Sequence, residues 1–231
     1  TQAVKRSDIS FICVPTPTVR GKIDLSQVRS AARELGKGLR DKRGYHLVVV
    51  KSTVVPTTTE RVVIPILEGS SGKRAGRDIG VCVNPEFLTE IQKSWTEEKE
   101  FKKDFFSEDR IVIGEFDERS GEALEKLYKM FYGDNVPPIL RTSTVNAELI
   151  KYASNAFLAT KISFINMIAR LCQKLPKADV TVVAQGMGLD RRIGPHFLRA
   201  GLGWGGSCFP KDVLSLINLG RKLGAKQSIA E

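Results

Sequence analysis

The stretch Ile9-Ser-Phe-Ile-Cys-Val14 is short, apolar and rich in β-branched residues, and it stops at Pro15-Thr16-Pro17. These features predict a buried β-strand that ends at a proline turn. Leu25–Leu39 follows with apolar residues at steps of three and four, the pattern of an amphipathic helix. A buried strand followed by a crossover helix is the unit from which parallel sheets are built, so this stretch favours an α/β fold.

The same alternation continues along the first 140 residues. Further strands are predicted at His46–Val50, Ile79–Val83 and Ile111–Ile113, and helices at Thr57–Leu67 and Arg119–Tyr132. We expect one parallel sheet with helices on both faces, because the connections between parallel strands must cross those faces.

Beyond the sheet region the periodicity is helical and no strand is predicted. Val145–Leu175 reads as one helical run of about 30 residues, and shorter helices are predicted at Ala178–Gln185 and Val213–Leu223. The expected organisation is an α/β domain at residues 1–140 followed by an all-helical domain at residues 141–231. A long helix that is apolar around much of its circumference needs cover, and a second copy of the chain is the expected source.

The literal G-x-G-x-x-G motif, Gly201–Gly206, stands in the wrong context for a dinucleotide-binding loop. It follows a helical segment instead of a strand, and Pro210 interrupts the helix that should come next. Nothing before Ile9 supplies a strand and a glycine-rich turn, so the first βαβ unit of such a domain is expected to be absent from this chain.

The composition is that of a globular protein, with 42% hydrophobic and 27% charged residues. The net charge of +10 suggests a nucleic-acid partner, but the charge is unevenly distributed. Residues 1–77 carry 15 basic and 6 acidic side chains, residues 78–132 carry 8 and 14, and residues 133–231 carry 13 and 6. A helix-turn-helix, a zinc site or a basic sheet with aromatic residues is missing, so a nucleic-acid-binding module is the weaker hypothesis. No apolar run is long enough to span a membrane.

The four cysteines contain no C-x-x-C pair, which favours a reducing compartment such as the cytoplasm. Cys13, Cys82 and Cys172 lie in apolar runs, where buried thiols are expected. No metal site is expected, because the only histidines, His46 and His196, lack ligand spacing.

Three predicted strands end in polar, turn-forming residues: Pro15-Thr16-Pro17, Ser52-Thr53 and Asn84-Pro85-Glu86. In open parallel sheets ligands bind at the carboxyl ends of the strands, so these residues predict a lined cleft. The alternative is that they are ordinary turns, since every strand must end in one.

Glu148, Lys151 and Asn155 are spaced to share one face of the long helix. They form either a solvated stripe with a Glu–Lys pair or a functional cluster. Asn155 favours the second interpretation, because it stands in an apolar stretch and a buried amide needs a hydrogen-bond partner.

The most specific local pattern is Gly203-Trp-Gly-Gly-Ser-Cys208-Phe-Pro-Lys-Asp212. Glycines leave the thiol of Cys208 uncrowded, and the carboxylate of Asp212 stands one helical turn further on. We interpret Cys208 as a catalytic nucleophile, with a structural cysteine as the alternative.

Taken in order, these motifs resemble the UDP-glucose/GDP-mannose family of nucleotide-sugar dehydrogenases over almost the whole chain. The resemblance rests on Val14-Pro-Thr-Pro17, Lys51-Ser-Thr-Val54, Asn84-Pro-Glu-Phe-Leu88, Asp109-Arg-Ile-Val-Ile-Gly114, Glu148-Leu-Ile-Lys-Tyr-Ala-Ser-Asn155 and Gly205-Gly-Ser-Cys-Phe-Pro-Lys-Asp212. It implies that residues 1–140 are the second half of an NAD-binding Rossmann-like domain, without its first βαβ unit. Residues 141–231 would be the central helical domain, which forms a homodimer and carries catalytic residues.

The resemblance also implies the reaction and its residues. NAD would oxidise a sugar C6 alcohol to a carboxylate through a thiohemiacetal and a thioester on Cys208. Lys151 and Asn155 would stabilise the oxyanion, Asp212 and Thr53 would hold the water, and Glu86 would be the base in hydrolysis. Arg192 would come from the adjoining subunit. Cofactor binding falls to Val14, Pro15, Thr16, Ser52, Thr53 and Glu90, and substrate binding to Glu86, Phe87, Leu88, Lys151, Asn155, Arg192, Gly205 and Phe209.

The C-terminal motifs resemble the branch of the family that acts on UDP-glucose, so a UDP-sugar is the expected partner. GDP-mannose or an N-acetylated UDP-sugar is the alternative substrate, and a non-catalytic dimerisation fragment is the alternative function. Two departures from the family pattern stand out. The charged segment Gln92–Lys103 reads as an insertion, which affects the placement of Glu90, and Thr57 stands where the family usually has glycine after proline.

Overall fold

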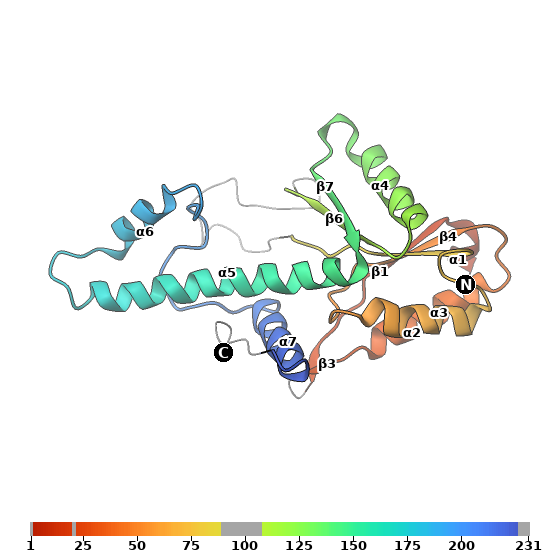
Figure 1. Ribbon diagram of the computed structural model, residues 1–231, viewed down its shortest axis with the longest axis horizontal. Coiled ribbons are helices and arrows are strands. Elements are labelled where there is room, and N and C mark those ends of the chain that lie inside the picture. The colour runs from red at the N-terminus through yellow and green to blue at the C-terminus, as the bar shows by residue number, and fades with distance from the viewer. Residues whose placement is uncertain (1, 20–21, 89–107, 226–231) are drawn as a thin grey trace. The chain divides into compact units, whose positions relative to one another are not determined.

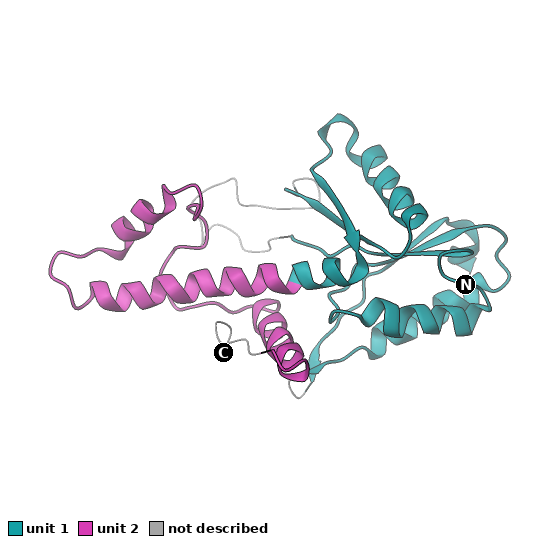
Figure 2. Ribbon diagram, viewed as in Figure 1, with its two compact units in different colours: residues 1–88, 105–151 teal, residues 89–104, 152–231 magenta. Residues whose placement is uncertain are grey.

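The computed structural model of the protein describes residues 2–19, 22–88 and 108–225 (Figure 1). These residues divide into two compact units (Figure 2). The first takes in the described residues up to Leu88 and those from 108 to Lys151, and the second begins at Tyr152.

A five-stranded sheet in the order β1-β4-β5-β6-β7 forms the centre of the first unit. Three of the strands, β4 (His46–Val50), β5 (Ile79–Val83) and β6 (Ile111–Glu115), follow the predicted ranges closely. β1 (Ile9–Ile12) is shorter than predicted, because its pairing with β4 ends at Ile12↔Val50. β7 (Ile139–Ser143) is an additional strand and spans residue 140.

Strand direction departs from the predicted all-parallel sheet at one place. β1, β4 and β5 are parallel, as are β6 and β7, but β6 runs antiparallel to β5, with Val83 opposite Gly114. The residues that lead from Glu108 into β6 therefore lie at the edge of the sheet where β1, β4 and β5 end. A buried strand reads as an apolar run in either direction, which is why the pattern did not predict the reversal.

Helices cover both faces of this sheet, as expected (Figure 1). On one face, Val48 and Val81 pack with apolar residues of α2 (Ser26–Leu39) and α3 (Ile64–Ser71). On the other face, Leu47 and Cys82 pack with α4 (Glu118–Tyr132). Successive strand residues enter opposite cores, as the alternation of side chains along a strand requires.

Smaller elements complete the first unit. These are helix α1 (Gln2–Arg6), the hairpin strands β2 (Thr18–Val19) and β3 (Lys22–Ile23), a π-helical turn η1 (Thr59–Val63) and a 3₁₀ turn η3 (Gly133–Asn135). η1 lies within the predicted helix Thr57–Leu67, which the structure divides into η1 and α3. The other segments are too short to produce a clear periodic pattern.

Helices are the regular secondary structure of the second unit in its described part, and turns and loops connect them. It contains α6 (Val180–Gly188), α7 (Phe209–Lys222) and the larger part of α5 (Thr144–Cys172), whose first turns belong to the first unit. Val213 and Ile217 of α7 pack on Ala159 of α5, together with Trp204 and Phe209. Within the described ranges, no helix combines the length and apolar character that crossing a bilayer would need.

Among the described residues of the first unit, Thr57 is the non-glycine residue with a positive φ. Its φ of +78° lies in the left-handed region, which costs a residue with a side chain about 1 kcal/mol or more. We expect Thr57→Gly to raise the free energy of unfolding by about 1 kcal/mol, since glycine adopts this conformation without strain. Urea denaturation would measure the change.

Thr58→Gly is the matched control, because Thr58 has a helical φ of −61°. Glycine there should lower the free energy of unfolding by about 1 kcal/mol. Destabilisation by both substitutions would contradict the assignment of strain to Thr57.

Candidate active site

The carboxyl ends of β1 and β4 lie side by side and are joined by side-chain hydrogen bonds. Ser52 Oγ donates to the main-chain oxygens of Val14 at 2.6 Å and Ile12 at 3.2 Å. Thr16 Oγ1 donates to the main-chain oxygen of Thr53 at 2.9 Å. Four of the residues predicted to bind a cofactor, Val14, Thr16, Ser52 and Thr53, are thus brought together, beside the exposed Pro15.

Glu86 and Lys151 meet within the first unit. Lys151, on α5, donates from Nζ to the main-chain oxygen of Glu86 and lies 3.9 Å from Glu86 Oε2. The side chain of Lys151 is only 6% exposed, whereas that of Glu86 is 34% exposed. A buried ammonium group held at a main-chain carbonyl is well placed to stabilise a negative charge nearby.

Aromatic and cationic groups surround the segment after Glu86. The Phe87 ring has the guanidinium carbon of Arg110 at 4.1 Å and Lys151 Nζ at 5.4 Å from its centroid. Phe87 and Leu88 are both partly buried. Glu90 and the predicted insertion Gln92–Lys103 lie outside the described residues.

Cys208 stands at the start of helix α7 in the second unit. It is exposed, and Ser207 Oγ lies 3.5 Å from its Sγ. The flanking Gly205 and Gly206 have no side chain to cover the sulfur, and Gly206 has a φ of +79°. The thiol thus lies at the amino-terminal end of a helix, where the backbone N–H groups favour a negatively charged ligand.

Asp212 lies in the first turn of the same helix and is 1% exposed. Its Oδ2 accepts a hydrogen bond from Asn155 Nδ2 at 2.6 Å, and its Oδ1 accepts one from Lys211 Nζ at 2.6 Å. Asn155, itself buried, therefore has the partner that a buried amide requires. α5 and α7 together hold a buried carboxylate one helical turn from the exposed thiol.

The loop before Cys208 is tied to α5 by polar residues that the sequence reasoning did not single out. Ser163 Oγ accepts from Trp204 Nε1 at 2.8 Å, and Asn166 Oδ1 accepts from the main-chain nitrogen of Gly201 at 2.8 Å. The sequence does contain a signal for these contacts, because the polar residues Ser163 and Asn166 interrupt the apolar pattern of α5. Phe209, the first residue of α7, and Trp204 both pack against the apolar cluster of Ala159, Val213 and Ile217.

Arg192 is highly exposed and pairs with its neighbour Asp190. Its Nη2 lies 2.7 Å from Asp190 Oδ2, and its Nε lies 3.1 Å from Oδ1. This pair holds the guanidinium group at the surface of the second unit, and its proposed contact with a substrate remains a prediction.

Glu148 is neither a member of a solvated stripe nor a partner of Lys151. It is 2% exposed, and its carboxylate accepts from Thr57 N at 2.6 Å, Thr59 N at 2.9 Å and Thr59 Oγ1 at 2.7 Å. It thereby anchors the turn that follows Thr53 to the start of α5. The partners lie about 90 residues away in the chain, so local spacing could not reveal them.

Burial raises the pKa of Glu148 to about 7, although the three hydrogen bonds oppose the shift. The folded protein then retains a proton that the unfolded chain loses near pH 4.5. This contribution to stability is complete in acid and is lost as the pH rises toward 7. We expect Glu148→Gln to abolish this part of the pH dependence of the unfolding free energy, measured by urea denaturation between pH 4.5 and 7.

The matched control is Glu122→Gln on the exposed face of α4, which should keep the slope of the parent protein. If the unfolding free energy of Glu148→Gln falls with pH as steeply as that of the parent, Glu148 is not the source of this pH dependence.

The cysteines differ from the prediction at two positions. Cys82 is buried, as expected, but Cys13 is exposed and Cys172 is only partly buried. Cys13 lies just beyond the last residue of β1, and Cys172 is the last residue of α5, so both leave the apolar surroundings of their elements. Among the residues described, no group of three histidine, cysteine or carboxylate side chains could hold a metal ion.

Comparison with known proteins identifies the family. Residues 1–132 match the NAD binding domain of the UDP-glucose/GDP-mannose dehydrogenase family, and residues 145–231 match its central domain. The chain therefore belongs to this family of nucleotide-sugar dehydrogenases, and the resemblance based on its motifs is confirmed.

Individual relatives agree with this assignment. The UDP-glucose 6-dehydrogenase of Haloferax volcanii is 45% identical over 220 residues, which cover 94% of this chain and 49% of that protein. The GDP-mannose 6-dehydrogenase of Pseudomonas syringae pv. tomato is 42% identical over 219 residues, 93% of this chain and 47% of that protein. The chain thus spans about half the length of the relatives it matches.

A solved structure confirms the fold class. The UDP-glucose dehydrogenase of the hyperthermophilic archaeon Pyrobaculum islandicum matches with a TM-score of 0.86 and 45% identity, over 99% of this chain and 50% of that chain. A Rossmann-like α/β part followed by a helical central part is therefore the fold of this chain.

Proposed function

We propose that the chain belongs to an NAD-dependent dehydrogenase that oxidises the C6 alcohol of UDP-glucose to the carboxylate of UDP-glucuronate. The observation that carries the proposal is the pairing of an exposed Cys208 at the start of α7 with Asp212, which is buried and bonded to Asn155. A structural cysteine would need neither exposure nor a neighbouring buried carboxylate.

The residues at the carboxyl ends of β1 and β4 fit a dinucleotide. These residues are small or carry hydroxyl groups. The hydroxyl groups of Thr16 and Ser52 donate to main-chain oxygens, and these hydrogen bonds hold the two strand ends together. Ligands of open α/β sheets bind at this edge. Val14, Pro15, Thr16, Ser52 and Thr53 would hold NAD, which when bound supplies the hydride acceptor for both oxidations.

In the second unit, Cys208 provides the nucleophile. Its thiolate adds to the C6 aldehyde, the resulting thiohemiacetal loses a hydride to become a thioester, and water releases the carboxylate and restores the thiol. Over both oxidations, one alcohol and one water become a carboxylate with release of two hydrides and three protons. Asn155 donates toward the oxyanion, and Asp212 takes the proton that the C6 alcohol loses in the first oxidation and later holds the attacking water.

In the first unit, Lys151 supplies a positive charge and Glu86 a negative one. The ammonium group of Lys151, held at the main-chain oxygen of Glu86, stabilises the alkoxide or oxyanion. Glu86 is the base that activates water for thioester hydrolysis, and Thr53 helps to hold that water. Phe87 and Leu88 follow Glu86 in the chain and contact the substrate.

Arg192, Gly205 and Phe209 would contact the nucleotide sugar. An exposed guanidinium group suits a diphosphate, which accepts its hydrogen bonds in bidentate fashion. GDP-mannose is the second candidate substrate, because a GDP-mannose 6-dehydrogenase is nearly as similar to this chain as the UDP-glucose enzyme. The Gly-Gly-Ser-Cys-Phe-Pro-Lys-Asp motif favours UDP-glucose over N-acetylated UDP-sugars.

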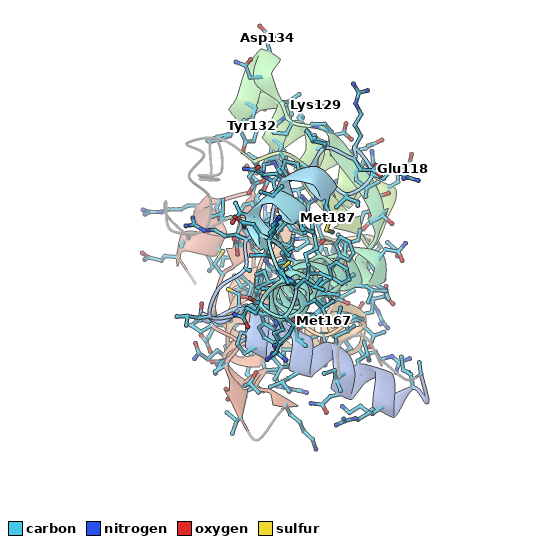
Figure 3. The ribbon with its side chains drawn as sticks, turned by 90° about the vertical axis from the view of Figure 1, so that its left-hand side faces the viewer. Glu118, Lys129, Tyr132, Asp134, Met167 and Met187 are labelled. Atoms are coloured by element: carbon cyan, nitrogen blue, oxygen red, sulfur yellow. The ribbon has the colours of Figure 1, made fainter. Side chains whose placement is uncertain are left out.

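A homodimer through α5 accounts for an exposed apolar stripe on this helix. Phe157 is 65% exposed, Phe164 follows seven residues later, and Met167 and Leu171 follow at steps of three and four. Met167, which is 51% exposed, is labelled in Figure 3. An exposed apolar stripe on a helix usually indicates a surface that another protein chain covers. We place the enzyme in the cytoplasm, where the thiol of Cys208 stays reduced.

Steady-state kinetics of the full-length protein would test the proposal. With NAD+, kcat/KM should be highest for UDP-glucose, lower for GDP-mannose and lowest for UDP-N-acetylglucosamine. Each molecule of UDP-glucose consumed should give two NADH. One NADH per sugar, or no preference for UDP-glucose, would overturn the reaction or its substrate respectively.

A further inference from the structure

The side chain of Asn84 joins several elements at the end of β5. Asn84 is 1% exposed, and its Nδ2 donates to the main-chain oxygen of Val112 in β6 at 2.9 Å. Its main-chain nitrogen donates to the oxygen of Val50 in β4, also at 2.9 Å. The orientation of this amide is therefore set by the neighbouring strands.

Two donors converge on the remaining polar atom, Asn84 Oδ1. Lys51 Nζ, from the residue directly after β4, donates at 2.9 Å, and the hydroxyl group of Tyr128 on α4 donates to the same oxygen. We call this arrangement of Lys51, Asn84 and Tyr128 the Asn84 clamp. It connects two strand ends and a helix through one carbonyl oxygen.

The clamp lies next to the residues that carry the proposed chemistry of the first unit. Glu86 follows Asn84 by two residues, and its main-chain oxygen accepts from Lys151. A rotation of Asn84 would therefore move both the carboxylate of Glu86 and the main-chain atom that orients Lys151.

Lys51 is a costly choice for a purely structural contact. Burial lowers its pKa, and the carboxylates of Glu108 and Glu86 oppose that shift, as does the thiol of Cys13, whereas the ammonium group of Lys151 adds to it. A buried ion pair often stabilises a fold no better than apolar residues of similar volume. A charged donor at this position thus points to a role in the geometry and charge of the site.

We propose that Lys51 is a positioning residue, which acts through Asn84 to hold Glu86 in the orientation required for thioester hydrolysis. The inference rests on the proposed function, since it assigns Lys51 to one step of that reaction. Lys51 itself need not touch substrate or cofactor. Its removal should slow the hydrolysis of the thioester and leave the earlier steps intact.

The test uses Lys51→Met in the full-length protein. A slower last step lowers kcat and KM together, so we expect kcat to fall about 10- to 100-fold while kcat/KM stays within about twofold of the parent value. NADH should appear in a burst before a slow steady state. The mass of the acid-quenched protein should show the acyl adduct on Cys208 in a larger fraction of the molecules than in the parent protein.

Tyr128→Phe provides an independent variant, because it removes the second donor to Asn84 Oδ1 without changing a charge. It should give the same pattern with a smaller loss of kcat, and it carries the test alone if Lys51→Met does not fold. In the double variant the losses should not multiply, since both side chains act on one oxygen.

Lys42→Met is the matched control. Lys42 is another buried lysine of the first unit, and its Nζ donates to the main-chain oxygens of Val4 and Ser7. Its loss should lower the melting temperature and leave kcat and kcat/KM unchanged.

Two results would overturn the proposal in distinguishable ways. If the parent protein is active but both clamp variants lose kcat and kcat/KM equally, without a larger fraction of acylated Cys208, the positioning role of Lys51 is wrong and the proposed function stands. If the parent protein forms no NADH from UDP-glucose, the proposed function is wrong and the inference falls with it.

Discussion

Replacing Cys208 with alanine should abolish the formation of UDP-glucuronate by the full-length protein. Without the thiol no thiohemiacetal or thioester can form, so the second oxidation loses its covalent route. We expect the rate of carboxylate formation to fall by at least about 10⁴-fold, the scale seen when a nucleophile is removed. The first oxidation does not need the thiol, so at most one NADH per sugar should remain. Mass analysis of the products together with NADH fluorescence would measure both.

Cys172→Ala is the control for the loss of a thiol. Cys172 ends α5 and is partly buried, and we assign it no part in the reaction. Its variant should retain the kcat of the parent protein. Carboxylate formation at the parent rate by Cys208→Ala would contradict the covalent mechanism.

The second large effect is expected for Asp212→Asn. The substitution keeps the shape of the side chain and an oxygen that can accept from Asn155 Nδ2, so the fold should persist. It removes the carboxylate that moves the proton, and such a loss typically costs about 10²- to 10⁴-fold in rate. We expect kcat to fall by about 10³-fold with a melting temperature within a few degrees of the parent value.

Asp179→Asn is the matched control, because Asp179 caps α6 by accepting from Thr181 N at 2.7 Å. It is expected to change stability slightly and kcat not at all. A 10³-fold loss of activity in Asp179→Asn, or a nearly normal kcat in Asp212→Asn, would refute the role of Asp212.

The strands and helices with strong periodic patterns were predictable from the sequence, and the weaker elements were not. β4 and β5 are buried along their whole length and read as unbroken apolar runs. β7 has only partly buried or exposed residues and contains Arg141 and Thr142, so its pattern is that of a loop. The reversed direction of β6 depends on packing beyond the reach of local sequence, because an apolar strand has no directional signature.

In the candidate site too, the short-range contacts could be predicted from the sequence and the long-range contacts could not. Cys208 and Asp212 stand four residues apart on one helix, so their proximity followed from spacing alone. The bonds of Glu148 to Thr57 and Thr59, and of Lys51 and Tyr128 to Asn84, join residues 33 to 91 positions apart. Such partners depend on the topology of the sheet, which places strand ends together irrespective of their order in the chain.

The central claim, that Cys208 carries a four-electron oxidation, is tested most directly by peptide mapping of the full-length protein quenched in acid during turnover. With UDP-glucose and NAD+, the peptide that contains Cys208 should carry an acyl adduct of the nucleotide sugar, and the adduct should be absent when NAD+ is omitted. Formation of UDP-glucuronate with two NADH but with the adduct on another residue would contradict the account.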